Sequence, residues 1–210
     1  MTAVEPIRLR DDVVELHPLA LEHVPGLVAA AGVARDTFGL TRVPDGEDAM
    51  REWVAYALDE QSRGVSLPFA TLDAKAGRVV GATRFMSIEY WSWPAPSPLQ
   101  RAPEAGPDVV EIGSTWLSQA VQRTAINTHA KLLMLRHAFE AWEVRRVTLK
   151  TDARNSRSRN AIERIGGRFD GVLRAHMPAS DGAVRDTAYY TILASEWPAV
   201  RAALEKLAGA

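Results

Sequence analysis

Two stretches of the sequence place small polar residues and arginines where a strand is expected to lead into a helix. The first covers residues 109–127, where Thr124 and Ala125 have small side chains and Arg123 adds positive charge. The N-terminus of a helix presents free backbone N–H groups and the positive end of the helix dipole, which together favour phosphate. This stretch is therefore a candidate phosphate site, although a capped turn without a ligand would have the same pattern.

The second stretch covers residues 152–167 and has Asn155, Ser156 and Ser158 around another predicted helix start, with arginines between them. If the two preceding strands are parallel neighbours, both helix N-termini lie at the same edge of the sheet. Two such helix ends can form one ligand pocket at that edge. The two stretches together predict a pocket for an anionic ligand.

The charge distribution also indicates an anionic partner. The chain of 210 residues has a formal net charge of -1, yet residues 145–185 hold ten basic residues, nine of them arginines, against four acidic ones. Residues 1–144 hold 13 basic and 19 acidic residues. Such a basic block is typical of a phosphate or nucleic-acid partner, or of a solvated charged face. No groove-reading motif or aromatic platform accompanies it, so we expect no nucleic acid as partner.

Composition excludes several other classes of function. The chain has no cysteine, which excludes a disulfide scaffold, a cysteine-ligated zinc site and a thiol nucleophile. The five histidines lack ligand spacing, so no metal is expected. No apolar run reaches the roughly 18 residues of a membrane helix, and the N-terminus lacks a signal-peptide pattern. These features predict a cytoplasmic protein without membrane association, folded as a single domain over residues 1–210.

Hydrophobic periodicity predicts the elements that position these residues. Strands are predicted at 13–18, 67–72, 79–90, 109–117, 146–151, 169–177 and 184–193, and helices near 24–28, 48–64, 127–143, 155–165 and 196–208. The predicted N-caps are Asp48, Asn127, Asn155 and Ser195. This order predicts an α/β (α+β) fold with a mixed, mostly antiparallel central sheet of about seven strands, one parallel pair and flanking helices.

Residues 91–108 differ in kind from the rest of the chain. They include five prolines and two tryptophans and show no periodicity, which predicts a loop of about 18 residues. Loops of this length are often functional. We interpret it either as a lid over a binding site or as a packed insertion.

The ordered set of motifs resembles the acetyl-CoA site of the GNAT N-acetyltransferase family, in particular its ribosomal-protein N-terminal branch. The family's pyrophosphate loop, Gln/Arg-x-x-Gly-x-Gly/Ala, corresponds to residues 122–127, where Ala125 and Asn127 replace the two glycines. Residues 155–158 follow the family's Asn-x-x-Ser motif, and the chain then runs to Gly166. The resemblance covers residues 12–198 and implies a core over that range with a C-terminal helix at 196–208.

The resemblance implies an acyl-CoA-dependent enzyme without a metal. It would move an acetyl group from acetyl-CoA, its co-substrate, to a primary amine on a peptide N-terminus or a small molecule, by direct attack in a ternary complex. The strand before the loop would splay from its parallel neighbour near residues 116–118. The implied cofactor-binding groups are the backbone of Trp116, Leu117 and Ser118 for the pantetheine arm and oxyanion, and Gln122, Arg123, Thr124, Ala125, Ile126 and Asn127 for the pyrophosphate.

Three further residues receive roles from the resemblance. Asn155 would orient the pantetheine or a water molecule, and Ser158 would donate a hydrogen bond or proton to the CoA thiolate. Glu111, in the strand before the loop, is the candidate general base. Structural alternatives stay open, because Ser158 could be an ordinary hydroxyl at a helix start and Glu111 a structural glutamate. Of Tyr189 and Tyr190 in the last strand, one is expected to face inward.

Two other functions remain open at this point. The altered pyrophosphate loop is compatible with a non-catalytic acyl-CoA-binding or assembly module. The acidic excess in residues 1–144 permits an aminoglycoside-type N-acetyltransferase, which needs an acidic cleft for its acceptor. A homodimer formed through residues 91–108 is a further option, since this loop could pack beside the acceptor channel or against a second subunit.

Overall fold

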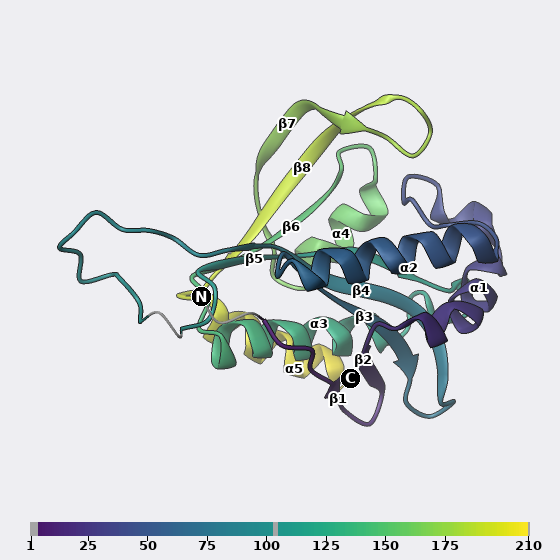
Figure 1. The fold of residues 1–210 in the computed structure, drawn as a ribbon, viewed down its shortest axis with the longest axis horizontal. Coiled ribbons are helices and arrows are strands. Elements are labelled where there is room, and N and C mark those ends of the chain that lie inside the picture. Colours follow the sequence, from purple (N-terminus) through teal and green to yellow (C-terminus); the bar gives the residue numbers. More distant parts are fainter. Residues whose placement is uncertain (1–3, 103–104, 210) are drawn as a thin grey trace.

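The computed structural model describes residues 4–102 and 105–209. Its centre is one eight-stranded sheet in the order β1-β2-β3-β4-β5-β6-β8-β7 (Figure 1). The strands are β1 (Leu9–Arg10), β2 (Val14–Pro18), β3 (Ser66–Asp73), β4 (Arg78–Glu89), β5 (Val109–Leu117), β6 (Arg146–Asp152), β7 (Arg168–Pro178) and β8 (Val184–Leu193). The β5–β6 pair is parallel and the other pairs are antiparallel, which confirms the predicted fold class.

Helices cover both faces of the sheet. They are α1 (Val24–Gly32), α2 (Glu47–Ser62), α3 (Ile126–Arg136), α4 (Ser156–Arg164) and α5 (Trp197–Ala208), and α3 continues into a π turn at His137–Ala141. Successive strand residues point to opposite faces. Phe69 accordingly belongs to the core under α3 and α5, whereas Ala70 belongs to the core under α1 and α2.

The sequence predicted the elements better than their caps. All seven predicted strands are present, and the eighth is the two-residue β1. Asn155 caps α4 as predicted, because its Oδ1 accepts a hydrogen bond from the Ser158 N–H at 3.0 Å. The other three predicted caps are wrong, since α2, α3 and α5 begin after Gly46, Ala125 and Glu196. Asp48, Asn127 and Ser195 each lie one or two residues from the true cap, the usual error for helix ends.

The parallel strands β5 and β6 separate soon after they meet. Their paired residues run only from Val109 opposite Arg146 to Glu111 opposite Thr148, although both strands continue. On its other side β5 carries a bulge against β4, where Ser114 has a φ of 49°. A bulge bends its strand. The splay therefore begins directly after Glu111, and the prediction that it lies near residues 116–118 was wrong in position.

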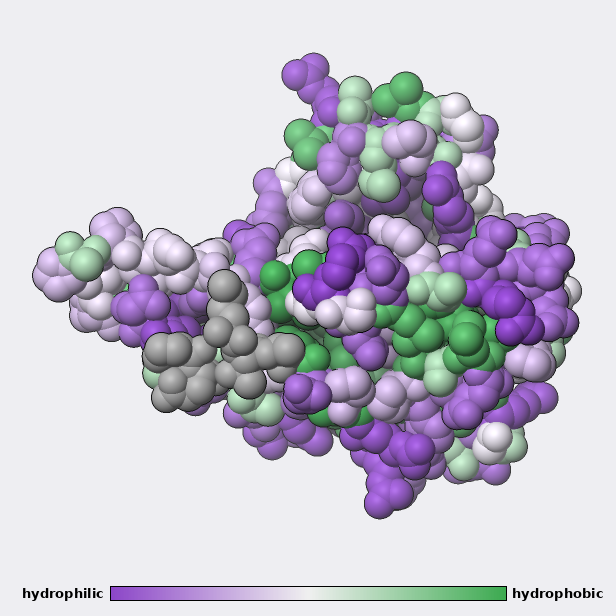
Figure 2. Space-filling view, in the orientation of Figure 1, coloured by the Kyte–Doolittle hydropathy of each residue, from purple (hydrophilic) through white to green (hydrophobic). Residues whose placement is uncertain are grey.

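The predicted loop at 91–108 is free of helix and strand in its described residues. It leaves the end of β4 and returns to β5, and it extends away from the body of the molecule (Figure 1). Figure 2 shows this projection as a mostly hydrophilic or neutral surface. Asp108 holds its base, because one carboxylate oxygen contacts the Arg145 Nε at 2.8 Å and the other accepts from the Trp91 N–H at 2.9 Å.

Neither a membrane-spanning helix nor a metal-binding cluster is present in the part of the chain that the structure describes. Within residues 4–102 and 105–209, no helix is both long and apolar enough to cross a membrane. The same ranges hold no cluster of three or more histidine, aspartate or glutamate side chains arranged to bind a metal ion.

Candidate active site

A cavity of about 650 Å³ opens where β5 and β6 diverge. The first residues of α3 and α4 line it, as does the segment 38–42 between α1 and α2, which the sequence did not single out. Nine of the twelve predicted site residues line this cavity: Glu111, Trp116, Leu117, Gln122, Arg123, Thr124, Asn127, Asn155 and Ser158. Ser118, Ala125 and Ile126 lie outside its lining.

The lining of this cavity is strongly cationic. Its basic residues are Arg42, Arg84, Arg123, Lys131, Lys150, Arg157, Arg164 and Arg185, against the single carboxylate of Glu111. Four of these eight cations come from the basic block at 145–185. A cavity lined by one sign of charge concentrates ligands of the opposite sign. The cavity therefore suits a ligand with several negative charges.

The loop before α3 leaves backbone donors free at the cavity. Arg123 has a φ of 63°, the left-handed conformation. The Thr124 hydroxyl donates to the Val121 carbonyl at 2.7 Å, and the Gln122 amide donates to the Leu117 carbonyl at 3.0 Å, so side chains hold the loop. Within the described part of the chain, no acceptor is found for the N–H groups of residues 123–125. These donors, at the start of a helix, can hold a phosphate.

The predicted donors at residues 116–118 are only partly free. The Ser118 N–H donates to the Val80 carbonyl at 2.7 Å, so it belongs to the β4–β5 ladder. Donors alternate between the two sides of an antiparallel strand. The Leu117 N–H therefore points to the gap between β5 and β6, and the Trp116 N–H points to β4. Leu117 is the donor of the three that the splay exposes.

The start of α4 presents a free hydroxyl to the same cavity. The Ser158 side chain lines it and has no hydrogen-bond partner among residues 4–102 and 105–209. Asn155 also lines the cavity, but its Oδ1 is already used to cap the helix. Ser158 can therefore donate a hydrogen bond to a ligand, and Asn155 can do so through its amide nitrogen.

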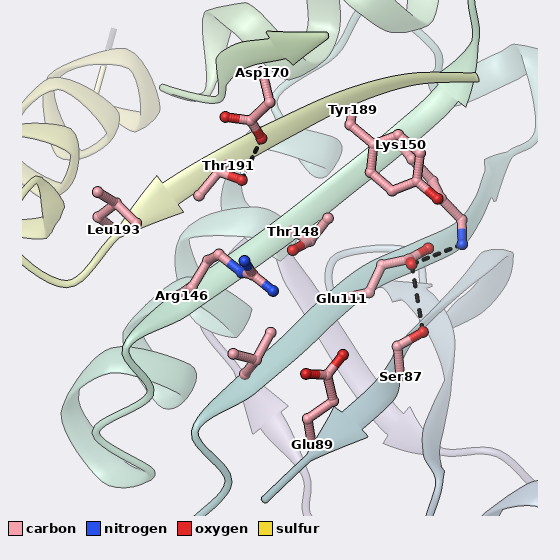
Figure 3. Close-up of a pocket in the computed structure, with 11 residues that line it drawn as sticks. Ser87, Glu89, Glu111, Arg146, Thr148, Lys150, Asp170, Tyr189, Thr191 and Leu193 are labelled. Carbon is pink, nitrogen blue, oxygen red and sulfur yellow. Dashed lines mark hydrogen bonds and ion pairs between the residues drawn. The ribbon is translucent and has the colours of Figure 1, made fainter. Parts of the chain in front are cut away.

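Glu111 lies at the junction of this cavity and a second one, of about 640 Å³, which is open on the face of β4, β5, β6 and β8 (Figure 3). Only 4% of the Glu111 residue is exposed. Its Oε2 lies 2.9 Å from the Lys150 Nζ and 3.5 Å from the Ser87 hydroxyl (Figure 3). Glu111 and Lys150 line both cavities, so their ion pair orients a carboxylate where the two cavities meet.

Tyr189 and His176 extend the group around Lys150. The Tyr189 hydroxyl lies 3.3 Å from the His176 Nε2, and the Lys150 Nζ lies 6.0 Å from the centre of the Tyr189 ring. Burial, followed by the charges of Lys150 and Arg185, lowers the pKa of His176. Tyr190, the next residue, is fully buried. This confirms that one of the two tyrosines faces inward, and it places Tyr189 in the second cavity.

Lys131 on α3 is a functional candidate that the sequence did not reveal. Only 4% of it is exposed, and its Nζ donates to the hydroxyls of Thr83 at 3.0 Å and Thr115 at 2.8 Å. No carboxylate of the described residues pairs with it, and burial lowers its pKa to about 7. One sequence signal could have indicated that Lys131 is buried. It lies three and four residues before Met134 and Leu135, which are apolar and buried, so all three share one face of the helix.

The two cavities together suit a transfer between two ligands. A large anionic ligand fits the cationic cavity at the helix starts, and a second ligand can reach Glu111 from the open face of the sheet. A buried carboxylate between them can accept a proton from one ligand while the other reacts.

Comparison with known proteins agrees with this geometry. A family model described as an acetyltransferase (GNAT) domain matches residues 14–168. YdaF of Bacillus subtilis, which carries the provisional name of a ribosomal N-acetyltransferase, is 33% identical over 87 residues, 41% of this chain and 46% of YdaF. The chain thus spans about half the length of this curated relative.

Solved structures extend the similarity over nearly the whole chain. A GCN5-related N-acetyltransferase from Brucella melitensis is 29% identical with a TM-score of 0.79, covering 98% of this chain and 86% of that one. RimJ of Mycobacterium smegmatis, solved in complex with CoA-disulfide, shares the fold at 21% identity and a TM-score of 0.76, covering 98% and 93% of the two chains. The match to the family model spans most of the chain, which therefore belongs to the GNAT family of acetyltransferases.

Proposed function

We propose that this chain, acting as a single domain, transfers an acetyl group from acetyl-CoA to a primary amine by direct attack in a ternary complex. The observation that carries the proposal is that two cavities meet at the buried carboxylate of Glu111. One cavity is lined by eight cations and two helix starts, and the other opens on the face of β4, β5, β6 and β8, with Glu111 in the lining of both. Two reactants can therefore bind at once and react at their junction.

The residues of the cationic cavity fit the phosphates of CoA. The free N–H groups of residues 123–125 lie at the N-terminus of α3, where the helix dipole favours negative charge. Arg123 adds a cation to this loop, and Arg42 and Arg157 line the cavity as well. When bound there, acetyl-CoA supplies the thioester that is broken in the reaction. The Leu117 N–H, on the splayed side of β5, can donate a hydrogen bond to the pantetheine arm. It lies roughly 20 Å along the strand from Glu111, too far to stabilise an oxyanion that forms beside that carboxylate.

Two side chains, Glu111 and Ser158, handle the protons of the proposed reaction. Glu111 accepts the proton that the acceptor nitrogen releases as the new N–C bond forms, directly or through a water molecule. Ser158 donates a hydrogen bond or proton to the sulfur as the C–S bond breaks. The chain has no cysteine to form a covalent acyl-enzyme, and this absence supports direct attack.

The acceptor is an amine on a peptide N-terminus or on a small molecule. An α-amino group has a pKa near 8 in peptides, against about 10.4 for lysine, so it loses its proton with less help from the enzyme. This difference favours an α-amine. The similarity to YdaF, whose provisional name is that of a ribosomal N-acetyltransferase, supports a protein N-terminus.

Calorimetric titration with acetyl-CoA, followed by a thiol-release assay over a panel of amines, tests the proposal. We expect binding, and amine-dependent release of CoA. Binding without release across the panel would identify a non-catalytic binding module, and no binding would refute both functions. Release that is restricted to aminoglycosides would identify that class of acceptor instead.

Replacing the proposed base gives the sharper test. Glu111→Gln should lower kcat by about 100-fold or more, chiefly at lower pH, where more of the acceptor amine must lose a proton on the enzyme. Glu52→Gln, at an exposed glutamate of α2, serves as the matched control and should leave kcat unchanged. A pH–rate profile of Glu111→Gln that matches the wild type would remove Glu111 from the mechanism.

A further inference from the structure

Arg146 is an unpartnered cation in the second cavity. The two cations that line this cavity are Arg146 and Lys150, and Lys150 is paired with Glu111. Arg146 makes no ion pair or side-chain hydrogen bond with any residue in 4–102 or 105–209, and its Nε is buried without an acceptor. Buried polar atoms in native proteins normally have a partner. A buried guanidinium nitrogen without one indicates that an acceptor is supplied by something else.

The sheet register places Arg146 at a defined distance from the proposed base. Arg146 lies opposite Val109, and Thr148 lies opposite Glu111, so Arg146 is two residues along β6 from the level of Glu111. Two residues of strand and one strand spacing put the Cα atoms of Arg146 and Glu111 roughly 8 Å apart. Figure 3 shows both side chains on the same face, with Thr148 between Arg146 and Lys150 along β6. An acceptor lying along this face can contact both.

The other carboxylates of the cavity already have partners. Asp170 accepts from the Thr191 hydroxyl at 2.5 Å, and Glu89 accepts from the Trp91 indole N–H at 3.2 Å. Glu89 is exposed, and the register separates it from Arg146 by the intervening strand at Val109. Val109, a lining residue of this cavity, lies between these two charges in the sheet register. No carboxylate of the described residues comes within ion-pair distance of Arg146.

We propose that Arg146 binds a carboxylate of the acceptor, so that the enzyme selects amines that carry a nearby negative charge. This inference rests on the proposed function, because it assigns the amine to Glu111. A guanidinium can hold a carboxylate through two parallel hydrogen bonds, which gives orientation as well as attraction. The carboxylate comes either from the α-carboxyl of an amino acid or from an acidic side chain near a peptide N-terminus.

Matched acceptors distinguish these two sources. The probes are hexapeptides with Ser at the N-terminus and Glu, Gln or Lys in the second place, together with free amino acids and their carboxamides. We expect kcat/KM to be about 10- to 100-fold higher for the acidic member of one pair, the range of a charge-assisted hydrogen bond. Preference for Glu over Gln identifies the side chain, and preference for amino acids over amides identifies the α-carboxylate.

Variants at Arg146 then test whether the preference for an acidic acceptor depends on the Arg146 guanidinium. Arg146→Gln should abolish the preference by lowering kcat/KM much more for the acidic acceptor than for the uncharged one, and Arg146→Glu should favour the Lys peptide over the Glu peptide. Arg78→Gln, at an exposed arginine with no side-chain partner in the described part of the chain, is the matched control and should keep the preference. Calorimetry with acetyl-CoA verifies that each variant retains the donor site.

Three results would overturn the inference. Arg146→Gln could lower kcat/KM equally for charged and uncharged acceptors, or the wild type could show no preference within any pair. Glu89→Gln could reproduce the effects of Arg146→Gln, which would mean that Arg146 serves only to pair with Glu89. If no amine releases CoA, the proposed function fails by itself. Calorimetric binding of the Glu and Gln peptides to the CoA-loaded protein then decides the carboxylate site independently.

Discussion

The buried ammonium of Lys131 makes a strong prediction about how the stability of this protein depends on pH. Burial lowers its pKa to about 7, from an ordinary value of 10.5. The residue has two threonine hydroxyls as partners and no carboxylate among the described residues. A charge held in this way opposes folding whenever Lys131 is protonated. Removing it should therefore stabilise the protein at acidic and neutral pH.

The magnitude follows from the two pKa values. Between pH 7 and 10.5 the unfolded chain holds a proton on Lys131 that the folded chain has released, so the free energy of unfolding rises with pH. The slope reaches about 1.4 kcal/mol per pH unit, and the whole window amounts to roughly 5 kcal/mol. Below pH 7 both states are protonated, and the full penalty is present.

Lys131→Met removes this titration with little change in side-chain volume. The hydroxyls of Thr83 and Thr115 keep their mutual contact at 2.8 Å, so the variant loses about 1 kcal/mol for each of two hydrogen bonds. The mutation removes a penalty of roughly 5 kcal/mol and loses hydrogen bonds worth about 2 kcal/mol. We therefore expect Lys131→Met to be more stable than the wild type by about 3 kcal/mol at pH 6. The advantage should shrink and then vanish as the pH rises to 9 or 10.

Urea unfolding at pH 6, 7, 8 and 9 measures this difference directly. Lys75→Met, at an exposed lysine in the turn between β3 and β4, is the matched control and should follow the wild-type curve. Curves for Lys131→Met and wild type that stay parallel over this range would refute the reasoning. A constant offset would mean that Lys131 acts through packing, with a pKa that the fold leaves unchanged.

Two further predictions concern how the site and its neighbouring loop are held. A Cβ at Gly113 would lie 2.7 Å from the Met86 Sδ and 2.8 Å from the Glu111 Oε1. Gly113→Ala should therefore displace the proposed base and lower kcat about 10- to 100-fold in the thiol-release assay. An unchanged kcat would show that this carboxylate oxygen is free to move. Asp108→Ala removes the contacts to Arg145 and Trp91 at the start and end of the loop. Limited proteolysis within 91–108 should then become several-fold faster than in the wild type. Equal rates would mean that other contacts anchor the loop.

The parts of the fold that the sequence predicted depend on local patterns. Alternating apolar residues identified the strands, because each strand buries one or both of its faces. The Asn155 cap was visible because its side chain acts on a residue only three positions away. The parallel β5–β6 unit followed from one helix between two strands. Of the nine predicted residues that line the cavity, Arg123, Thr124, Asn155 and Ser158 were singled out because they lie at the two strand-to-helix junctions. The others followed from the resemblance to the family and from the chemistry of the reaction that it implies.

The remaining features depend on contacts between distant segments. A lysine on a helix is normally expected on the solvent-exposed face. Lys131 is buried instead, because its Nζ donates to hydroxyls on β4 and β5. The segment 38–42 reaches the cavity because the Arg157 guanidinium and the Gln122 amide contact Thr37. The early splay of β5 follows from a bulge against β4, for which a single strand gives no sequence signal. Each of these requires two elements to be placed before it can be seen.

The two replaced glycines of the pyrophosphate loop show how this chain keeps the loop's path. Ala125 has φ -67° and ψ -19°, and Asn127 lies inside the first turn of α3, so both adopt a helical conformation open to any residue. The left-handed residue is Arg123, at a position that the family pattern leaves free. Such a conformation costs about 1 kcal/mol at a residue with a side chain. The backbone conformation at 125 and 127 therefore does not require glycine. The family's glycines would serve there to leave space for the ligand. Asn127 lines the cavity, so its amide gives a phosphate an additional donor in place of that space.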